Sequence, residues 1–124
     1  MNLDLITDPE LAPRPRDEVR IRELSVTPYP DGRRLRVQLL LTPFAPVDRP
    51  NLEITARRVD GLMVASVSVI ESMQHHLNLT IHLRDPQPVP GEYVVQADLY
   101  YEPAQVQHSV SCSVVLPGTE PLSP

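Results

Sequence analysis

The sequence predicts an all-β fold, a seven-stranded antiparallel β-sandwich that forms one domain of a 124-residue chain. Apolar residues recur at every second position almost throughout, and turn signals follow about every 8–12 residues, which is typical of sandwiches. The chain also has 15 prolines, about twice the ordinary share. Prolines at that density would break helices but suit loops and strand edges. At most one helical turn, over residues 71–74, is expected.

The first predicted strand covers residues 19–27. Its apolar side chains change parity between Ile21 and Leu24, and one extra residue near 22–23 explains that change as a β-bulge. Pro28 follows directly, which favours an edge strand because proline lacks the N–H that a central strand needs. The sequence therefore predicts a bulged first strand at the edge of a sheet.

The second predicted strand covers residues 34–42 and follows the turn signal Asp31-Gly32. The loop after it, PFAPVDRP, is stiffened by proline and holds Phe44, which is expected to cap one end of the sandwich. Alternate residues of the strand are aliphatic and should face the core, namely Leu35, Val37, Leu39 and Leu41.

The clearest predicted hairpin joins strands at 51–59 and 62–70 through the turn Asp60-Gly61. A two-residue loop sets the register of both strands, so each cross-strand pair can be predicted. The apolar pairs then fall on one face and the polar pairs on the other, so the turn and the face pattern agree. The predicted pairs are Val59 with Leu62, Ala56 with Ala65, Ile54 with Val67, Leu52 with Val69, Thr55 with Ser66, and Glu53 with Ser68.

Three more strands are predicted at 76–83, 91–102 and 107–116. The flanking segments 1–18 and 117–124 show little periodicity and are rich in proline, so they are predicted to be tails of a sandwich domain that covers 19–116. The residues expected to face the core are Leu77, Leu79, Ile81 and Leu83, then Tyr93, Val95, Ala97, Leu99 and Tyr101, and finally Val110, Cys112, Val114 and Leu116.

The sixth predicted strand carries a motif, Gly91-x-Tyr93-x-Val95-x-Ala97. It resembles the sixth strand of immunoglobulin-like domains, which often reads Gly-x-Tyr-x-Cys-x-Ala. The resemblance implies that Tyr93 makes a tyrosine corner, with its hydroxyl bonding backbone a few residues upstream, next to the loop that holds Asp85. Valine replaces the disulfide cysteine and tryptophan is absent. The chain is therefore more similar to the fibronectin type III variant or to a bacterial immunoglobulin-like module, and so common a fold implies no activity.

The composition argues against several classes of partner and location. A net charge of −5 disfavours nucleic acid and anionic membranes as partners. No apolar stretch is long enough for a membrane helix and no signal peptide is evident, so a cytoplasmic protein is expected. The single cysteine cannot form an intramolecular disulfide. Arginine without lysine favours the codon bias of a GC-rich genome, and the alternative is a surface for bidentate carboxylate or phosphate contacts.

No residues have the spacing of a catalytic, cofactor or metal site, so neither enzymatic activity nor a cofactor is expected. His76 and His82 share an outward face but lie about 20 Å apart along one strand, too far to bind one ion. Cys112 is predicted to be a small buried hydrophobic residue. His108 lies about 13 Å from it along the strand, too far to activate the thiol.

The candidate partner-binding residues are Tyr100, Arg34 and Arg36. Tyr100 is predicted to face solvent, and exposed tyrosines are enriched at the hot spots of interfaces. Arg34 and Arg36 share the predicted first hairpin with Arg20 and Arg22, where they could meet an acidic partner. The plainer alternatives are an exposed tyrosine without a role, and arginines that keep an edge strand from aggregating.

The sequence thus indicates a non-catalytic immunoglobulin-like interaction or structural module. Its expected partner is another protein or a second copy of the chain, which would form a homodimer through an exposed strand edge or by packing of sheet faces. The alternative is a β-sandwich that binds carbohydrate or another small ligand, although few aromatic rings are present to stack on sugars. A hydrolase or metalloenzyme ranks lowest.

Overall fold

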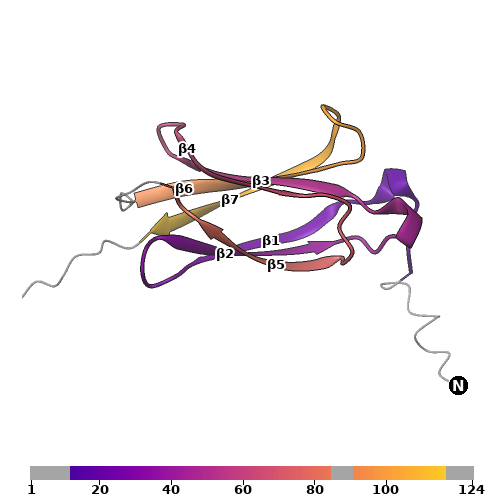
Figure 1. Cartoon of the computed structure of the whole chain (residues 1–124), viewed down its shortest axis with the longest axis horizontal. Helices are drawn as coiled ribbons and strands as arrows, with labels where there is room; N and C mark the ends of the chain where they lie inside the picture. Colours follow the sequence, from indigo (N-terminus) through magenta and orange to yellow (C-terminus); the bar gives the residue numbers. More distant parts are fainter. Residues whose placement is uncertain (1–11, 85–90, 117–124) are drawn as a thin grey trace, which may run out of the picture.

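Two antiparallel sheets pack face to face (Figure 1), as the alternation of apolar residues predicts. The computed structural model describes residues 12–84 and 91–116. In one sheet the order is β1-β2-β5, with β1 at Ile21–Pro28, β2 at Arg34–Leu41 and β5 at His76–His82. In the other the order is β4-β3-β6-β7, with β3 at Asn51–Arg58, β4 at Met63–Val69, β6 at Gly91–Tyr100 and β7 at Val106–Leu116. Two short 3₁₀ turns complete the described part, η1 at Arg16–Glu18 and η2 at Pro46–Asp48.

The core is made by the inward faces of the central strands and is almost entirely aliphatic. All the residues that alternation assigns to the core in β2 and β3 are fully buried, and in β6 the same holds, with Tyr93 as the aromatic member at 2% exposure. Each leucine, isoleucine or valine side chain among them contributes about 1.5–3 kcal/mol on burial. These rows are Leu35, Val37, Leu39 and Leu41 of β2, Leu52, Ile54 and Ala56 of β3, and Tyr93, Val95, Ala97 and Leu99 of β6.

The predicted bulge in the first strand is confirmed. Ile21 pairs with Leu41 and Glu23 pairs with Leu40, so Arg22 is the extra residue. The bulge allows Ile21 to be buried while the residues after it continue the inward face in the opposite parity. β1 is also an edge strand of its sheet, as Pro28 predicts.

The hairpin between β3 and β4 corrects one predicted pair. The Arg58 N–H donates to the Leu62 carbonyl at 2.9 Å, so the loop has three residues and Val59 does not face Leu62. Gly61 takes the left-handed conformation that such loops need, with φ +94. A bulge at Val64 then compensates for the longer loop, and the other five predicted pairs are confirmed.

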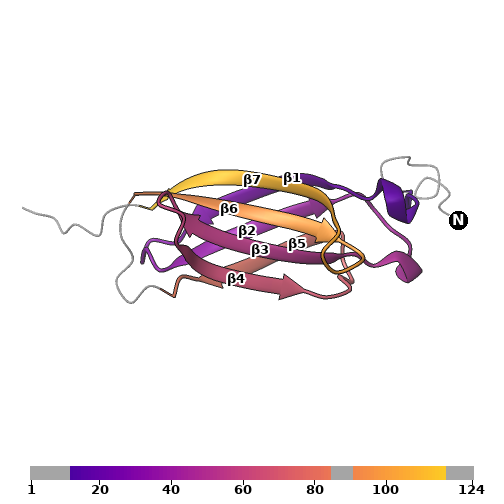
Figure 2. The same cartoon turned by 90° about the horizontal axis from the view of Figure 1, so that it is seen from above.

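Hydrogen bonds between side chains and the backbone join the two sheets along one long side of the sandwich, where β1 lies beside β7 (Figure 2). The Ile21 N–H donates to His108 Nδ1 at 3.0 Å, across the gap between the two sheets. Gln107 Nε2 donates to the Val19 carbonyl at 2.9 Å and to the Arg16 carbonyl at 3.0 Å. The edges of β1 and β7 are therefore held together, and we call this the sealed side.

The opposite long side, which we call the open side, is formed by the edges of β4 and β5 (Figure 2). Within the described residues, β4 pairs only with β3, and β5 pairs only with β2. Neither strand contains Arg, Lys, Asp, Glu or Pro. The Arg84 N–H donates to the Val64 carbonyl at 2.8 Å, so the last described residue after β5 covers the start of β4.

Part of the segment predicted to be an N-terminal tail lies on the sandwich. The Arg14 N–H donates to the Pro43 carbonyl at 2.9 Å, and Arg14 forms a parallel bridge with Phe44, which is half-buried against the core. η1 and η2 consequently meet at one end of the sandwich (Figure 1). The domain limits of 19–116 stay a prediction. Residues 1–11 and 117–124, and the Asp85 loop of the expected tyrosine corner, lie outside the described residues.

Replacing His108 by Ala should destabilise the sealed side. The substitution removes the acceptor of the Ile21 N–H, and a buried donor left without its partner costs about 1–3 kcal/mol. We expect urea unfolding at pH 7.5 to give a free energy of unfolding lower by about 1–2 kcal/mol.

His82→Ala is the matched control, because His82 is exposed on β5 and its imidazole makes no hydrogen bond to another described residue. Its free energy of unfolding should stay within about 0.5 kcal/mol of the unchanged protein. An equal decrease in the free energy of unfolding in the two variants would show that the hydrogen bond between His108 and the Ile21 N–H does not contribute to stability.

Candidate functional site

The structure places the three predicted partner-binding residues on opposite sheets. Tyr100 is the last residue of β6 and is half-buried on the outer face of the four-stranded sheet. Arg34 and Arg36 lie on β2, on the outer face of the three-stranded sheet. The three side chains therefore do not form one site, and a role for any of them in binding a partner stays a prediction.

Arg34 and Arg36 are both held by near neighbours. Arg34 Nε donates to Asp31 Oδ2 at 2.9 Å, and its guanidinium lies over the Tyr29 ring, 4.2 Å from the centroid. Arg36 Nε donates to Asn78 Oδ1 at 3.2 Å. The Arg33 N–H, more than the Arg34 guanidinium, lowers the pKa of the Asp31 carboxyl. These contacts organise the β1–β2 turn and leave the arginines less available than the sequence alone suggests.

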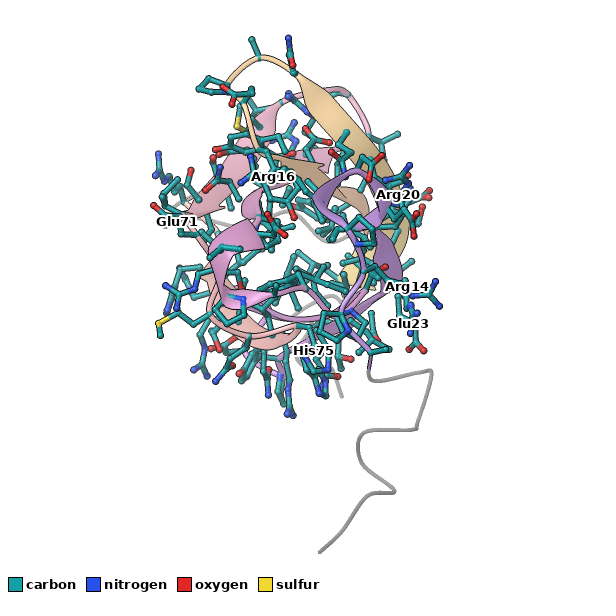
Figure 3. The ribbon with its side chains drawn as sticks, turned by 90° about the vertical axis from the view of Figure 1, so that its right-hand side faces the viewer. Arg14, Arg16, Arg20, Glu23, Glu71 and His75 are labelled. Atoms are coloured by element: carbon teal, nitrogen blue, oxygen red, sulfur yellow. The ribbon has the colours of Figure 1, made fainter. Side chains whose placement is uncertain are left out.

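A hollow of about 410 Å³, here called the end depression, lies beside Tyr100 at the end of the four-stranded sheet. The start of β3, the end of β6, η2 and the segment after β4 meet there, so residues far apart in sequence become neighbours. Figure 3 shows this end of the molecule, with Arg16 and Glu71 labelled. The residues that line it are Arg16, Pro46, Val47, Arg49, Asn51, Ile70, Glu71, Tyr100, Tyr101 and Pro103.

Three of the residues at this end hold one another in a fixed frame. Arg16 Nε donates to Asp48 Oδ1 at 3.2 Å, and the Arg16 guanidinium lies 4.6 Å from the centroid of the Tyr101 ring. The Tyr101 hydroxyl donates to the Asp48 carbonyl at 2.8 Å. Partial burial, with the nearby Asp48 carboxylate as a second cause, raises the pKa of Tyr101 to about 12. The frame joins η1, η2 and the end of β6, and Tyr101 is at the rim of the core as predicted.

Asn51 fixes the opposite wall of the depression. Its Oδ1 accepts the Glu71 N–H at 2.8 Å, and its Nδ2 donates to the Tyr101 carbonyl at 3.4 Å. Glu71 has φ +50, a left-handed conformation that non-glycine residues rarely adopt. The expected helical turn over 71–74 is therefore wrong. The chain bends there instead, and the Ser72 hydroxyl donates to the Gln74 carbonyl at 2.7 Å.

Three polar side-chain groups that line the depression have no partner among the described residues. The Arg49 guanidinium, the Glu71 carboxylate and the Tyr100 hydroxyl make no hydrogen bond or ion pair with another residue in the described ranges. Arg49 and Tyr100 are half-buried, while Glu71 is exposed. The arrangement presents one cation, one anion and one ring in a shallow hollow, so it can bind a hydroxylated or carboxylated molecule. Nothing in the sequence pattern singled out Arg49 or Glu71.

Two carboxylates face each other on the outer side of the four-stranded sheet. Glu53 of β3 is directly opposite Asp98 of β6, an arrangement that is usually unfavourable. Serines of the flanking strands offset it. Ser66 and Ser68 of β4 donate to Glu53 at 2.7 and 2.5 Å, and Ser109 of β7 donates to Asp98 at 2.6 Å. These serine hydroxyl groups therefore stabilise both carboxylates on the polar outer face of the sheet.

The histidines and the cysteine take ordinary structural positions. In the part of the chain that the structure describes, no three His, Cys, Asp or Glu residues come close enough to hold a metal ion. His76 and His82 are exposed on β5, and His108 accepts the Ile21 N–H. Cys112 is on the inward face of β7, as predicted, but it is half-buried rather than buried because β7 is an edge strand.

Comparison with known proteins gives a likeness of fold. No protein-family model and no curated protein sequence matches the chain. Among solved structures, two glycosyl hydrolase family 2 members from Bacteroides cellulosilyticus match 79% of this chain, with TM-scores of 0.59 and 0.54 and identities of 17% and 13%. A β-glucuronidase from Lactobacillus rhamnosus matches 80% of it, with a TM-score of 0.51 and 12% identity.

The matched region is a small part of each of those proteins. It covers 14%, 15% and 16% of their chains, so the likeness extends to one β-sandwich segment in each. At such identities it shows the fold alone. In the described residues, no helix is long and apolar enough to cross a bilayer.

Replacing Tyr101 by Phe should loosen the frame at the end depression. The loss of the hydroxyl bond to Asp48 should lower the free energy of unfolding by about 1 kcal/mol at pH 7. The folded pKa of about 12 lies above the unfolded value, so the phenol stabilises the fold below pH ~10 and that contribution disappears as the pH rises through 12.

Urea unfolding at pH 7, 10 and 11 tests this expectation. The decline in stability above pH 10 should be smaller in the Tyr101→Phe variant than in the unchanged protein. Tyr100→Phe is the control, since the Tyr100 hydroxyl makes no bond to a described residue. A Tyr101→Phe variant that declines as steeply as the unchanged protein would contradict the assignment.

Proposed function

We propose that the chain is a non-catalytic, cytoplasmic interaction module that binds a protein partner, either another protein or a second copy of the chain, through the open side of its sandwich. The observation that carries the proposal is the contrast between the two long sides. One side is held together by His108 and Gln107, while on the other the described residues leave most of the edges of β4 and β5 without a hydrogen-bonded neighbour.

Exposed strand edges are binding surfaces because their N–H and C=O groups have no partner within the sheet. Natural proteins usually protect them with charges, prolines or bulges. β1 has all three kinds of protection, in Arg22, Glu23 and Pro28. β4, which reads MVASVSV, has no charge and no proline, and its bulge lies at the end that Arg84 covers. A partner strand that pairs with β4 would satisfy its backbone groups, as in other cases of strand addition.

We also propose that the fold is a fibronectin type III-like variant of the immunoglobulin sandwich. In the constant-type immunoglobulin fold the fourth strand belongs to the same sheet as the first two. Here β4 pairs with β3 in the other sheet, and Val95 is at the position of the missing disulfide cysteine. Both features support the variant that the short β3–β4 connection suggests.

Replacing Ser68 by Lys tests the open side with little risk to the fold. The new ammonium would lie beside Glu53, which now accepts a bond from the Ser68 hydroxyl, so an ion pair can replace that bond. The matched control is Ser109→Lys on β7, where Asp98 plays the part of Glu53. Affinity capture from a lysate of the source organism, followed by quantitative mass spectrometry, compares the two variants with the unchanged protein.

A partner that binds the open side should be captured by the unchanged protein and by Ser109→Lys, and be reduced at least tenfold with Ser68→Lys. Thermal unfolding of each variant controls for loss of the fold. Equal capture by all three proteins, or equal loss in both variants, would contradict the proposal.

A second candidate function is binding of carbohydrate. It is supported by the end depression, where Tyr100, Arg49 and Glu71 have side-chain groups that no described residue pairs and that could contact a hydroxylated ligand. The β-sandwich segments that this chain resembles also occur within glycosyl hydrolases. The weakness of this candidate is that Val47 and Ile70 at the rim are 81% and 64% exposed, and such apolar surface suits a protein better than a sugar.

A glycan array with the unchanged protein and the double variant Tyr100→Ala, Arg49→Ala tests the carbohydrate candidate. Binding that is specific and lost in the double variant would support it. An array with no signal above background, or signal that the double variant retains, would eliminate the end depression as a sugar site.

A further inference from the structure

We infer that the partner at the open side is a second copy of this chain, which pairs through its own β4 in an antiparallel arrangement centred on Val67. The inference rests on the proposed function of the open side and names its partner. It follows from the sequence of β4, from the charges near it, and from the incomplete burial of its inward side chains.

The sequence of β4 is nearly symmetric about Val67, so an antiparallel pair of β4 strands places residues of the same or similar type opposite each other. Ser66 of one copy would face Ser68 of the other on the outer side of the sheet. Ala65 would face Val69 on the inner side, and Val67 would face itself. A two-fold axis requires this kind of self-complementarity, and no charged side chain opposes it within the strand.

The charged β3 residue nearest the centre of the proposed strand pair permits two copies to approach. Glu53 is on β3, one strand away from the edge, and it accepts bonds from Ser66 and Ser68. Three strand spacings would separate the two Glu53 residues of a dimer, about 14 Å. That distance exceeds the Debye length of about 8 Å at physiological ionic strength, so their repulsion is largely screened.

Two side chains of β4 would gain cover from the second copy. Val67 and Val69 point to the core side of the sheet, yet both are only half-buried because no strand lies beyond β4. A neighbouring β4 would continue the sheet to eight strands and shield both side chains. A single strand pair buries less area than a typical stable dimer, so the association should be weak and depend on concentration.

β5 has a similar symmetry about Leu79, but it is the less suitable edge. Its outward residues include His76 and His82, which are larger than the serines of β4 and would face each other across a β5 pair. The twist of a sandwich also keeps its two sheets about 30° apart, so one two-fold axis cannot pair both edges over their whole length. β4 is therefore the edge that makes the hydrogen bonds.

Sedimentation or light scattering from about 5 μM to about 1 mM, a range that covers weak transient dimers, tests the pairing. The mass of the unchanged protein should rise from 13.9 kDa toward twice that value. Ser109→Lys should behave likewise, and Ser68→Lys should keep the mass of one chain throughout. His76→Lys, which charges β5 instead, should still form the dimer. A dimer lost only in His76→Lys would overturn the assignment to β4.

The register is tested by disulfide trapping in a Cys112→Ser background. Val67→Cys should form a covalent dimer on mild oxidation, because residue 67 of each copy would face its mate. Ser66→Cys should not, because the two Cα atoms would be too far apart for a disulfide. Equal trapping at both positions would contradict the proposed register.

A mass of one chain at all concentrations would overturn self-pairing. The proposed function would then still be supported if Ser68→Lys lost a partner that Ser109→Lys retained. If that difference were absent as well, both proposals would fail. The two experiments therefore distinguish failure of self-pairing from failure of the proposed function.

Discussion

Two sheets have four edges, and the backbone groups along those edges are the constraint on which the rest of the structure depends. Core packing aligns the sheets but leaves every edge N–H and C=O in need of a partner. At β1 and β7 the chain supplies that partner with side chains, through the bond from the Ile21 N–H to His108 and the bonds from Gln107. At β4 and β5, within the described residues, the only such bond is the one from the Arg84 N–H to the start of β4, and the proposal that this side binds a partner rests on that difference.

At one end of the sandwich, polar side chains likewise supply the partners that neighbouring polar groups need. Arg16, Asp48 and Tyr101 satisfy one another and join η1, η2 and the end of β6. In the neighbouring end depression the side chains of Arg49 and Glu71 stay unpaired among the described residues. The outer face of the four-stranded sheet is likewise balanced by serines that donate to its two carboxylates. Polar satisfaction is thus nearly complete, with no buried polar side-chain atom unpaired in the described ranges.

Local sequence patterns predicted most of the fold, but they could not predict the contacts between residues that are distant in the sequence. The period of two placed the core residues of β2, β3 and β6, and the parity change near Arg22 located the bulge, because both signals are local. The hairpin loop was predicted one residue too short, since the bulge at Val64 restores the parity that a shorter loop would give. The bond between Ile21 and His108 joins residues 87 positions apart, and no pattern within a strand indicates it. The roles of Arg49 and Glu71 depend on which charges remain unpaired after folding.

Hydrogen exchange of individual backbone amides, measured by NMR at low and high protein concentration, tests the difference between the two sides most directly. The account predicts slow exchange of the Ile21 amide at both concentrations. It predicts fast exchange of every second amide of β4 in dilute solution, and protection of those amides when the concentration rises. Slow exchange along the whole of β4 in dilute solution, or fast exchange of Ile21, would contradict the account.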